Sequence, residues 1–335
     1  MVEAELRQAR PVAPLRLIPV KFMGGLLAIG AGLALGREGP TIQMGARLAH
    51  LIGKAFRRND DECRALLAAG AGAGLATAFN APIAGSVFVL EELVRQFETS
   101  VTLATLAASA GAIAVARVLV GMAPDFHVEP LPYPGPGTIP VHLASGLLAG
   151  LLGVAYNVAL LGALAATKRF QRLPVELRAA VIGAMIGLLA WFAPGVVGGG
   201  DSITQRTLEG TQPLAALLLV FVLRFGLGPV SYAAGVPGGL FAPLLVLGAQ
   251  SGLFCGILYG RWLPGVAPHP AELAVVGMAA FFTAVVRAPI TAIILVVEMT
   301  GSFNLLLPML AACFAAMLVP ILLHNPPIYD SLRPE

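Results

Sequence analysis

The feature that most constrains the fold of this chain is a series of long apolar runs that recurs along its whole length. Only 12% of the 335 residues are charged, against about 25% in a typical soluble domain. A helix needs about 20 apolar residues to cross a bilayer. We therefore expect an all-α, polytopic membrane protein with no separate soluble domain. The apolar runs are residues 17–35, 65–90, 101–122, 141–167, 179–197, 214–223, 240–259, 273–286, 289–299 and 305–323.

Glycine and proline interrupt several of these runs or make them too short to span a bilayer. The chain has 39 glycines and 26 prolines, which favours discontinuous or re-entrant helices. Inside a membrane such breaks are tolerated only where protein buries them or where they line a cavity. The breaks therefore predict a pathway through the protein.

Charge and reactive residue types exclude several classes of function. The net charge of +3 is too small to indicate a nucleic-acid partner. The five histidines and three cysteines lack metal-ligand spacing and no Ser/His/Asp set is discernible, so we expect no metal, no cofactor and no enzymatic activity. The first residues are polar and do not resemble a cleavable signal peptide. A basic cluster predicts one cytoplasmic loop; its residues are Lys168, Arg169, Arg172 and Arg178.

Two segments of the chain match two later segments in the same order and at almost the same separation. Residues 71–92 align with 278–299, and residues 36–53 align with 239–256. Membrane helices rich in glycine and alanine resemble one another by composition, which leaves chance as an alternative. An internal repeat is the stronger interpretation, and transporters built from repeats bind their substrates between the halves.

A Gly-x-x-x-Pro element, at residues 36–40 and again at 239–243, precedes an apolar helix in each copy. Proline suits the first helical turn, and glycine lets the backbone turn sharply. Each element therefore predicts a helix N-terminus held inside the membrane. Such an end presents unpaired N–H groups and the positive pole of the helix dipole, which together favour a small anion.

Two carboxylates distinguish the first copy from the second. Glu38 stands where the second copy has Phe241, and Glu92 stands where it has Met299. Acidic groups in a membrane are costly and are functional candidates. We expect Glu38 to compete with the permeant anion until it is protonated, as a gate and proton carrier; a helix-capping role is the alternative. For Glu92 the alternative to a function is a solvated helix end beside Arg95.

Other polar residues of the two copies are expected to be structural. Glu91 is matched by Glu298, so we expect each to bond a backbone group or helix end in its half. Asn80 and Arg287 occupy matching positions and are predicted to anchor helix ends. Arg37 is either a ligand contact or a structural partner for a carbonyl or carboxylate.

These motifs resemble those of the chloride channel and transporter family, CLC. The resemblance covers about residues 10–329 and rests on GREGPTIQMGA, FNAPIAGSVFVLEE, PGGLFAP, RAPITAIILVVEMT and a late PIY, in the family's order and spacing. It implies a homodimer with one pore per subunit, each pore built from an inverted repeat of tilted helices. It also implies an anion site that includes Arg37, Glu38, Gly39, Leu240, Phe241 and Tyr329.

The resemblance gives several of these residues a role. Glu38 matches the external gating glutamate, Leu240 and Phe241 match residues that offer backbone N–H groups to the anion, and Tyr329 matches one that offers its hydroxyl. Glu92 matches the internal proton-transfer glutamate of the exchanger branch, whereas the channel branch usually has an apolar residue there.

One departure from the family concerns the first residues. The family has a G-S-G-I-P loop whose serine completes the anion site, and Met1 aligns just after it. We expect a single truncated transmembrane domain over 1–335, with the remainder of the first repeat at 15–122, the second repeat and its preceding helices at 140–324, and no cytoplasmic regulatory domain. A misplaced start site, an expression fragment and a naturally shortened gene all stay open.

The resemblance and the residues together favour a secondary active transporter that exchanges chloride, or a similar small anion, for protons. Its expected location is the lipid bilayer of a bacterial inner membrane. A passive voltage- or pH-gated channel of the same fold is the first alternative, and Glu92 is the feature against it. A fragment that transports nothing is the second alternative, because the loop is missing.

Overall fold

The computed structural model describes residues 2–7, 10–121, 124–169, 174–210, 212–264 and 268–332. Helices dominate these residues, and the β-pairing found among them is an isolated antiparallel bridge between Gly36 and Gly239. The expected all-α fold is therefore confirmed. Of the predicted basic cluster, Arg172 lies outside the described residues.

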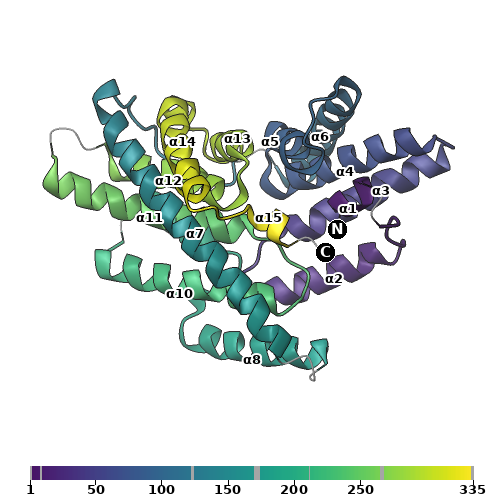
Figure 1. Cartoon of the computed structure of the whole chain (residues 1–335), viewed down its shortest axis with the longest axis horizontal. Helices are drawn as coiled ribbons and strands as arrows, with labels where there is room; N and C mark the ends of the chain where they lie inside the picture. Colours follow the sequence, from purple (N-terminus) through teal and green to yellow (C-terminus); the bar gives the residue numbers. More distant parts are fainter. Residues whose placement is uncertain are drawn as a thin grey trace.

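Elements of the first part of the chain lie on the right of Figure 1, and those of the last part lie on the left. The first group is α1 (Val2–Leu6), α2 (Leu17–Gly30), α3 (Glu38–Ala55), α4 (Asp60–Phe79), α5 (Pro82–Phe88), the π-helix η1 (Val89–Leu93) and α6 (Thr99–Val120). A short 3₁₀ turn, η2 (Pro136–Thr138), then leads into the long α7 (Ile139–Arg169), which crosses the molecule diagonally, and α8 (Val175–Phe192) follows.

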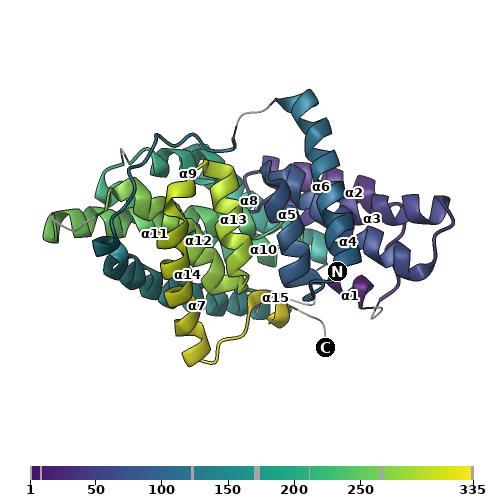
Figure 2. The same ribbon diagram turned by 90° about the horizontal axis from the view of Figure 1, so that it is seen from above.

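The last part of the chain begins with the 3₁₀ turn η3 (Pro194–Val196) and ends with a helix of four residues. Its elements are α9 (Asp201–Leu208), α10 (Leu214–Ala233), α11 (Phe241–Trp262), α12 (Pro270–Val286), α13 (Pro289–Thr300), the 3₁₀ turn η4 (Phe303–Leu305), α14 (Leu306–Leu322) and α15 (Ile328–Ser331). In Figure 2, α5 and α13 stand side by side where the two groups meet.

Six helices among the described residues are long and apolar enough to cross a bilayer. They differ widely in how deeply the protein buries them: 78% of the apolar window of α11 is buried, against 6% for α8. A helix that is apolar all round belongs either in a protein core or against lipid. Most of α11 therefore lies in the protein core, and α8 lies at the periphery.

The predicted repeat is visible in matching contacts. Gly45 of α3 and Gly70 of α4 lie so close that a side chain on either would meet the other's carbonyl oxygen, and Gly248 of α11 and Gly277 of α12 repeat this contact. Small residues allow membrane helices to approach in this way. The predicted helix-end anchors match as well, because Asn80 ends α4 and Arg287 ends α12, both in the left-handed region.

Two of the apolar runs differ from the helices that form. The run at 65–90 is divided between α4, α5 and part of η1, because Asn80 caps α4 with a φ of 47° and Pro82 opens α5. The run at 214–223 is extended to Ala233 in α10, through an interior proline, Pro229. An arginine that ends an apolar run in the sequence therefore need not end a helix.

Candidate functional site

Two helix N-termini meet inside the molecule, at the ends of α3 and α11. Gly36 donates its N–H to the carbonyl of Gly239 at 2.9 Å, and Gly239 donates to the carbonyl of Gly36 at 2.8 Å. The bridge joins the two Gly-x-x-x-Pro elements, for which the sequence predicted helix N-termini held inside the membrane. Both helix dipoles then direct their positive ends into one small region.

Glu38 places its carboxylate at the N-terminus of α11. The Phe241 backbone N–H donates to Glu38 Oε1 at 2.6 Å, and Glu38 is only 1% exposed. Its other oxygen, Oε2, is buried and has no hydrogen-bond partner among the described residues. A buried carboxylate is costly unless it is paired or takes up a proton. The side chain thus occupies the place in which a small anion would accept N–H groups from α11.

The glycines of the bridge make room for this carboxylate. A Cβ atom added to Gly36 would overlap Glu38 Oε2, and one added to Gly239 would overlap Glu38 Oε1. Neither residue has a φ in the left-handed region, so close approach rather than backbone conformation requires glycine here. The first glycine of each Gly-x-x-x-Pro element is therefore explained by the Glu38 side chain that it must accommodate.

Aromatic rings hold Phe241 in place at the start of α11. Phe282 packs edge-on against it with ring centroids 4.6 Å apart, and Phe88 does the same at 5.2 Å. Tyr329 from α15 lies 6.3 Å away with a tilted ring. Edge-to-face contacts at these distances stabilise ring positions beyond the effect of burial. The backbone N–H that Phe241 offers to Glu38 is thus fixed from several sides.

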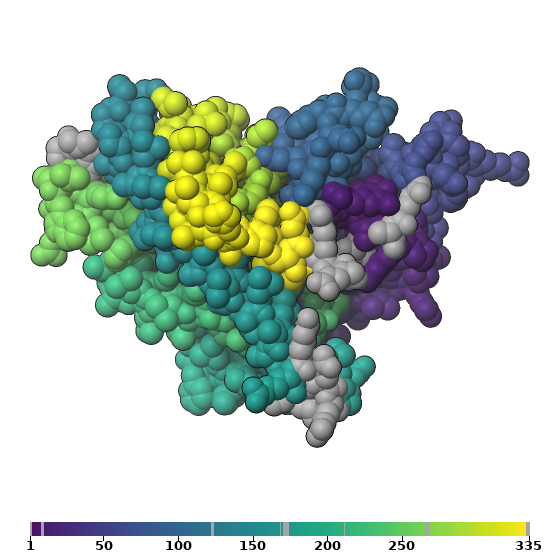
Figure 3. Space-filling view, viewed as in Figure 1, coloured from purple at the N-terminus to yellow at the C-terminus, as the bar shows by residue number. Residues whose placement is uncertain are grey.

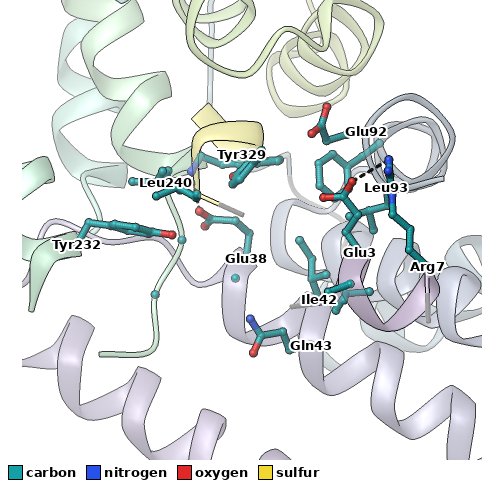
Figure 4. A pocket seen from close by; sticks show the side chains of 18 of the residues that line it. Glu3, Arg7, Glu38, Ile42, Gln43, Glu92, Leu93, Tyr232, Leu240 and Tyr329 are labelled. Carbon is teal, nitrogen blue, oxygen red and sulfur yellow. Dashed lines mark hydrogen bonds and ion pairs between the residues drawn. The ribbon is translucent and has the colours of Figure 1, made fainter. Parts of the chain in front are cut away.

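One cavity of about 580 Å³ contains both functional candidates, Glu38 and Glu92 (Figure 4). Residues of α1, α3, η1, α11 and α15 line it. The predicted site residues that line it are Glu38, Gly39, Glu92, Leu240, Phe241 and Tyr329. In Figure 4, Tyr329 and Leu240 lie close to Glu38, whereas Glu92 lies nearer to Glu3 and Arg7.

Glu92 is buried rather than solvated, with 5% of its surface exposed. Its Oε1 accepts a hydrogen bond from Arg95 at 2.9 Å. The π-helical turn η1 closes with a bond from the Val94 N–H to the Val89 carbonyl at 2.8 Å. A π-turn inserts one residue into helical register and often marks functional sites. Glu92 thus lies beside Arg95, as the alternative of a helix end expected, but it is buried rather than solvated.

Arg37 does not line the cavity among the described residues. Its Nε donates to the Ala78 carbonyl at 2.8 Å, and its Nη2 lies 3.5 Å from Asp125. These are the contacts of the structural alternative, a carbonyl and a carboxylate. In the loop that carries Asp125, burial raises the pKa of its carboxyl, and the Arg37 charge opposes this rise.

Glu91 and Glu298 cap helices in the opposite half of the protein. Glu91 accepts the N–H groups of Ile290 and Thr291 at 3.1 and 2.7 Å, at the start of α13. Glu298 accepts those of Ile83 and Ala84 at 3.1 and 2.8 Å, at the start of α5. The structural role predicted for this pair is confirmed, and each glutamate reaches across the repeat interface rather than within its half.

Three residues near the site were not predicted from the sequence. Tyr232 lines the cavity from the end of α10. Arg224, 2% exposed, donates to the carbonyls of Gly198 and Gly199 and so fixes the loop beside α11. Asp330 binds Arg95 at 2.7 Å. Arg224 could have been identified from the sequence, because a charged residue inside an apolar helix needs a partner. The sequence has no comparable feature that marks Tyr232 or Asp330.

Comparisons with known proteins agree with this geometry. A family model described as voltage gated chloride channel matches residues 1–320. A protein of Vibrio cholerae serotype O1 (strain M66-2), named H(+)/Cl(-) exchange transporter ClcA, is 39% identical over 99% of this chain and 72% of its own length. A Salmonella typhi protein with the same name is 36% identical over 99% of this chain and 71% of its own.

Solved structures show the same arrangement of helices. A slow cyanobacterial Cl⁻/H⁺ antiporter superimposes with a TM-score of 0.91 at 34% identity, over 99% of this chain and 78% of that one. A eukaryotic CLC transporter superimposes with a TM-score of 0.82 at 23% identity, over 99% of this chain and 59% of that one, which supports the fold alone. This chain therefore belongs to the voltage-gated chloride channel (CLC) family and is a multi-pass integral membrane protein.

Proposed function

We propose that this protein exchanges chloride, or a similar small anion, for protons. The observation that carries the proposal is the Glu38 carboxylate, which accepts the Phe241 N–H at the end of α11 and shares one cavity with Glu92. The names of the Vibrio and Salmonella relatives and of the cyanobacterial structure support the same activity. No step in it requires a metal or cofactor.

In the proposed cycle, anion and proton compete through one side chain. While ionised, Glu38 satisfies the α11 N-terminus and excludes the anion. Once protonated, its carboxyl loses the charge that the helix dipole favours, leaves the site and admits an anion. Leu240 and Phe241 would then offer backbone N–H groups, and Tyr329 its hydroxyl. Glu92 passes the proton between Glu38 and the cytoplasm.

Sidedness follows from the basic cluster, which would place the C-terminal end of α7 in the cytoplasm. The loop before α7 then faces outward. It contacts Arg37 through Asp125, and it contacts η4 through Asn304, which donates to the Leu131 carbonyl at 3.3 Å. In Figure 2 this loop follows the upper edge, while α1 and α15 lie at the lower edge. Glu38 is thus proposed to face outward, and Glu92 and Tyr329 inward.

We also propose the arrangement in which this site works. The first repeat spans 15–122, and the second repeat with its preceding helices spans 140–324. Two copies of the chain form a homodimer in a bacterial inner membrane, with one pathway in each. Arg37, at the outer mouth with Asp125, acts on the entering anion through its charge rather than as a ligand in the cavity.

Replacing Glu38 with glutamine tests the coupling role. Glutamine has the size of a protonated glutamate but carries no titratable proton, so we expect anion flux to persist and proton movement to disappear. Flux of both ions is measured in liposomes that contain the purified variant. The control is Glu129→Gln, in an exposed loop, which leaves both fluxes unchanged. A Glu38→Gln variant that still moves protons against their gradient would exclude this role.

A further inference from the structure

Arg95, two residues after the end of η1, links η1 to α15 at the inner end of the cavity. Its Nη2 donates to Glu92 Oε1 at 2.9 Å and to Asp330 Oδ1 at 2.7 Å, and its Nη1 lies 3.5 Å from Asp330 Oδ2. Asp330 follows Tyr329 directly on α15. In Figure 3 the surface of α15, in yellow, lies beside the purple surface of the first residues. Nη2 of Arg95 is thus shared between two carboxylates that lie far apart in the sequence.

The backbone of Arg95 is adapted to this position. Its φ of 58° lies in the left-handed region, which residues other than glycine adopt rarely and at a cost. Its Nε also donates back to the Glu92 carbonyl at 3.3 Å. The Arg95 side chain is 32% exposed, and its hydrogen bonds to Glu92 and to Asp330 of α15 fix its position. The guanidinium is therefore a fixed charge beside Glu92.

A fixed guanidinium presents a difficulty for a proton-transfer residue. A carboxylate paired with arginine at 2.9 Å is stabilised in its ionised form, so Glu92 alone with Arg95 would resist protonation. Asp330 makes protonation of Glu92 easier, because it adds a second negative charge nearby and gives Arg95 Nη2 a second hydrogen-bond acceptor. When Glu92 takes a proton from cytoplasmic water, Arg95 keeps Asp330 as its counter-ion, and no cation is left unpaired at the buried end.

We propose that Asp330 is a positioning residue for the inner proton step: by sharing the Arg95 guanidinium, it keeps Glu92 able to take up and release a proton. This inference rests on the proposed function, in which Glu92 passes protons inward. The charged groups that face Glu92 are Arg95 just after η1, Asp330 on α15 and Glu3 on α1. Glu3 is itself paired with Arg7 at 3.1 Å, which offsets its charge.

The first test reads the protonation of Glu92 without requiring transport. In purified protein, infrared difference spectra follow the carboxylic acid band that is lost in Glu92→Gln, as a function of pH. Removing the charge of Asp330 in Asp330→Asn favours ionised Glu92, so the midpoint should move down by about one pH unit. Arg95→Gln should move the midpoint up. Asp330→Glu keeps the charge and should restore the wild-type midpoint.

A matched control uses an exposed pair of the same length. Lys54 and Asp60 lie 2.7 Å apart, with the Asp60 side chain 85% exposed, and Asp60→Asn should leave the midpoint unchanged. An unchanged midpoint in Asp330→Asn, or a shift in the same direction for Asp330→Asn and Arg95→Gln, overturns the proposal. If Asp330→Asn fails to fold, an unchanged or lowered midpoint in Arg95→Gln overturns it, and an upward shift supports it.

A second test measures proton-coupled transport in liposomes. In liposomes, the pH at which proton flux is half-maximal should be about one pH unit lower in Asp330→Asn than in the wild type. Anion flux should be the same in Glu38→Gln and in the double variant Glu38→Gln/Asp330→Asn. If wild-type protein moves no protons at all, the proposed function fails, and the infrared midpoints still decide whether Asp330 acts on Glu92.

Discussion

At the scale of single residues, the adjacent glutamates Glu91 and Glu92 make different contacts because their side chains point in different directions. Residues next to each other on a helix are about 100° apart, and the π-turn η1 changes the register further. Glu91 reaches the start of α13, where Thr291 donates both its N–H and its hydroxyl to one carboxylate oxygen. Glu92 turns into the cavity with Glu38. Glu91 caps a helix of the other half, whereas Glu92 lines the cavity and is proposed to carry protons.

Replacing Glu92 with alanine should separate the two fluxes. Alanine cannot carry a proton, so we expect proton transport to be abolished and anion transport to continue. Both are measured in liposomes. The matched control is Glu91→Ala, which removes a helix cap and should lower thermal stability. If Glu92→Ala also lost anion flux and thermal stability together, Glu92 would be a structural residue like its neighbour.

The sequence predicted those residues whose chemistry is carried by a local motif. Glu38, Gly39, Leu240 and Phe241 belong to the two Gly-x-x-x-Pro elements and line the cavity as expected. Asp330 could not be predicted, because its contact with Arg95 joins residues far apart in sequence and depends on where α15 lies. For Arg37 the sequence left two interpretations open, and the contacts with Ala78 and Asp125 favour the structural one.

At the scale of elements, the reciprocal caps of Glu91 and Glu298 hold the two repeats together. Each carboxylate accepts two backbone N–H groups at the start of a helix from the other half. Charged acceptors form stronger hydrogen bonds than neutral ones, and the helix dipole adds to their effect. Glu298 thereby fixes the start of α5, and Glu91 fixes the start of α13 in the same way.

Glu298→Gln should weaken this interface while the size of the side chain stays nearly the same. A glutamine oxygen can accept from one N–H, but its amide nitrogen is a donor and cannot accept from the second. We expect a loss of about 1–2 kcal/mol in stability, measured as a lower midpoint of thermal unfolding in detergent. Glu91→Gln should cost about the same. A loss from only one of the two would contradict the equivalence of the caps.

Helix positions were predictable where apolar runs are bounded by polar residues, as in α6, α11 and α14. They were not predictable where a single polar residue interrupts an apolar run: the run at 65–90 contains the end of α4 and the start of α5, on either side of Asn80. The signal there was the Asn80-Ala81-Pro82 sequence, repeated with Arg287 before α13. Short helices such as α9 and α15 leave no periodic pattern and were missed.

At the scale of the whole molecule, the repeat brings two helix N-termini to one point and surrounds them with protein. Glu38 lies there, 1% exposed, between Gly36 and Gly239. A charged group at such depth is stable only if the fold supplies donors or a proton. We propose that the same requirement makes the site selective for a small anion and sensitive to protonation, which would be the physical basis of the exchange.

The measurement that tests this account most directly follows chloride and pH together outside liposomes that contain the wild-type chain and are loaded with chloride. The account predicts that chloride efflux drives protons inward against their gradient. Chloride efflux without proton movement would contradict it and indicate a passive channel. No flux from folded protein would contradict transport by this chain.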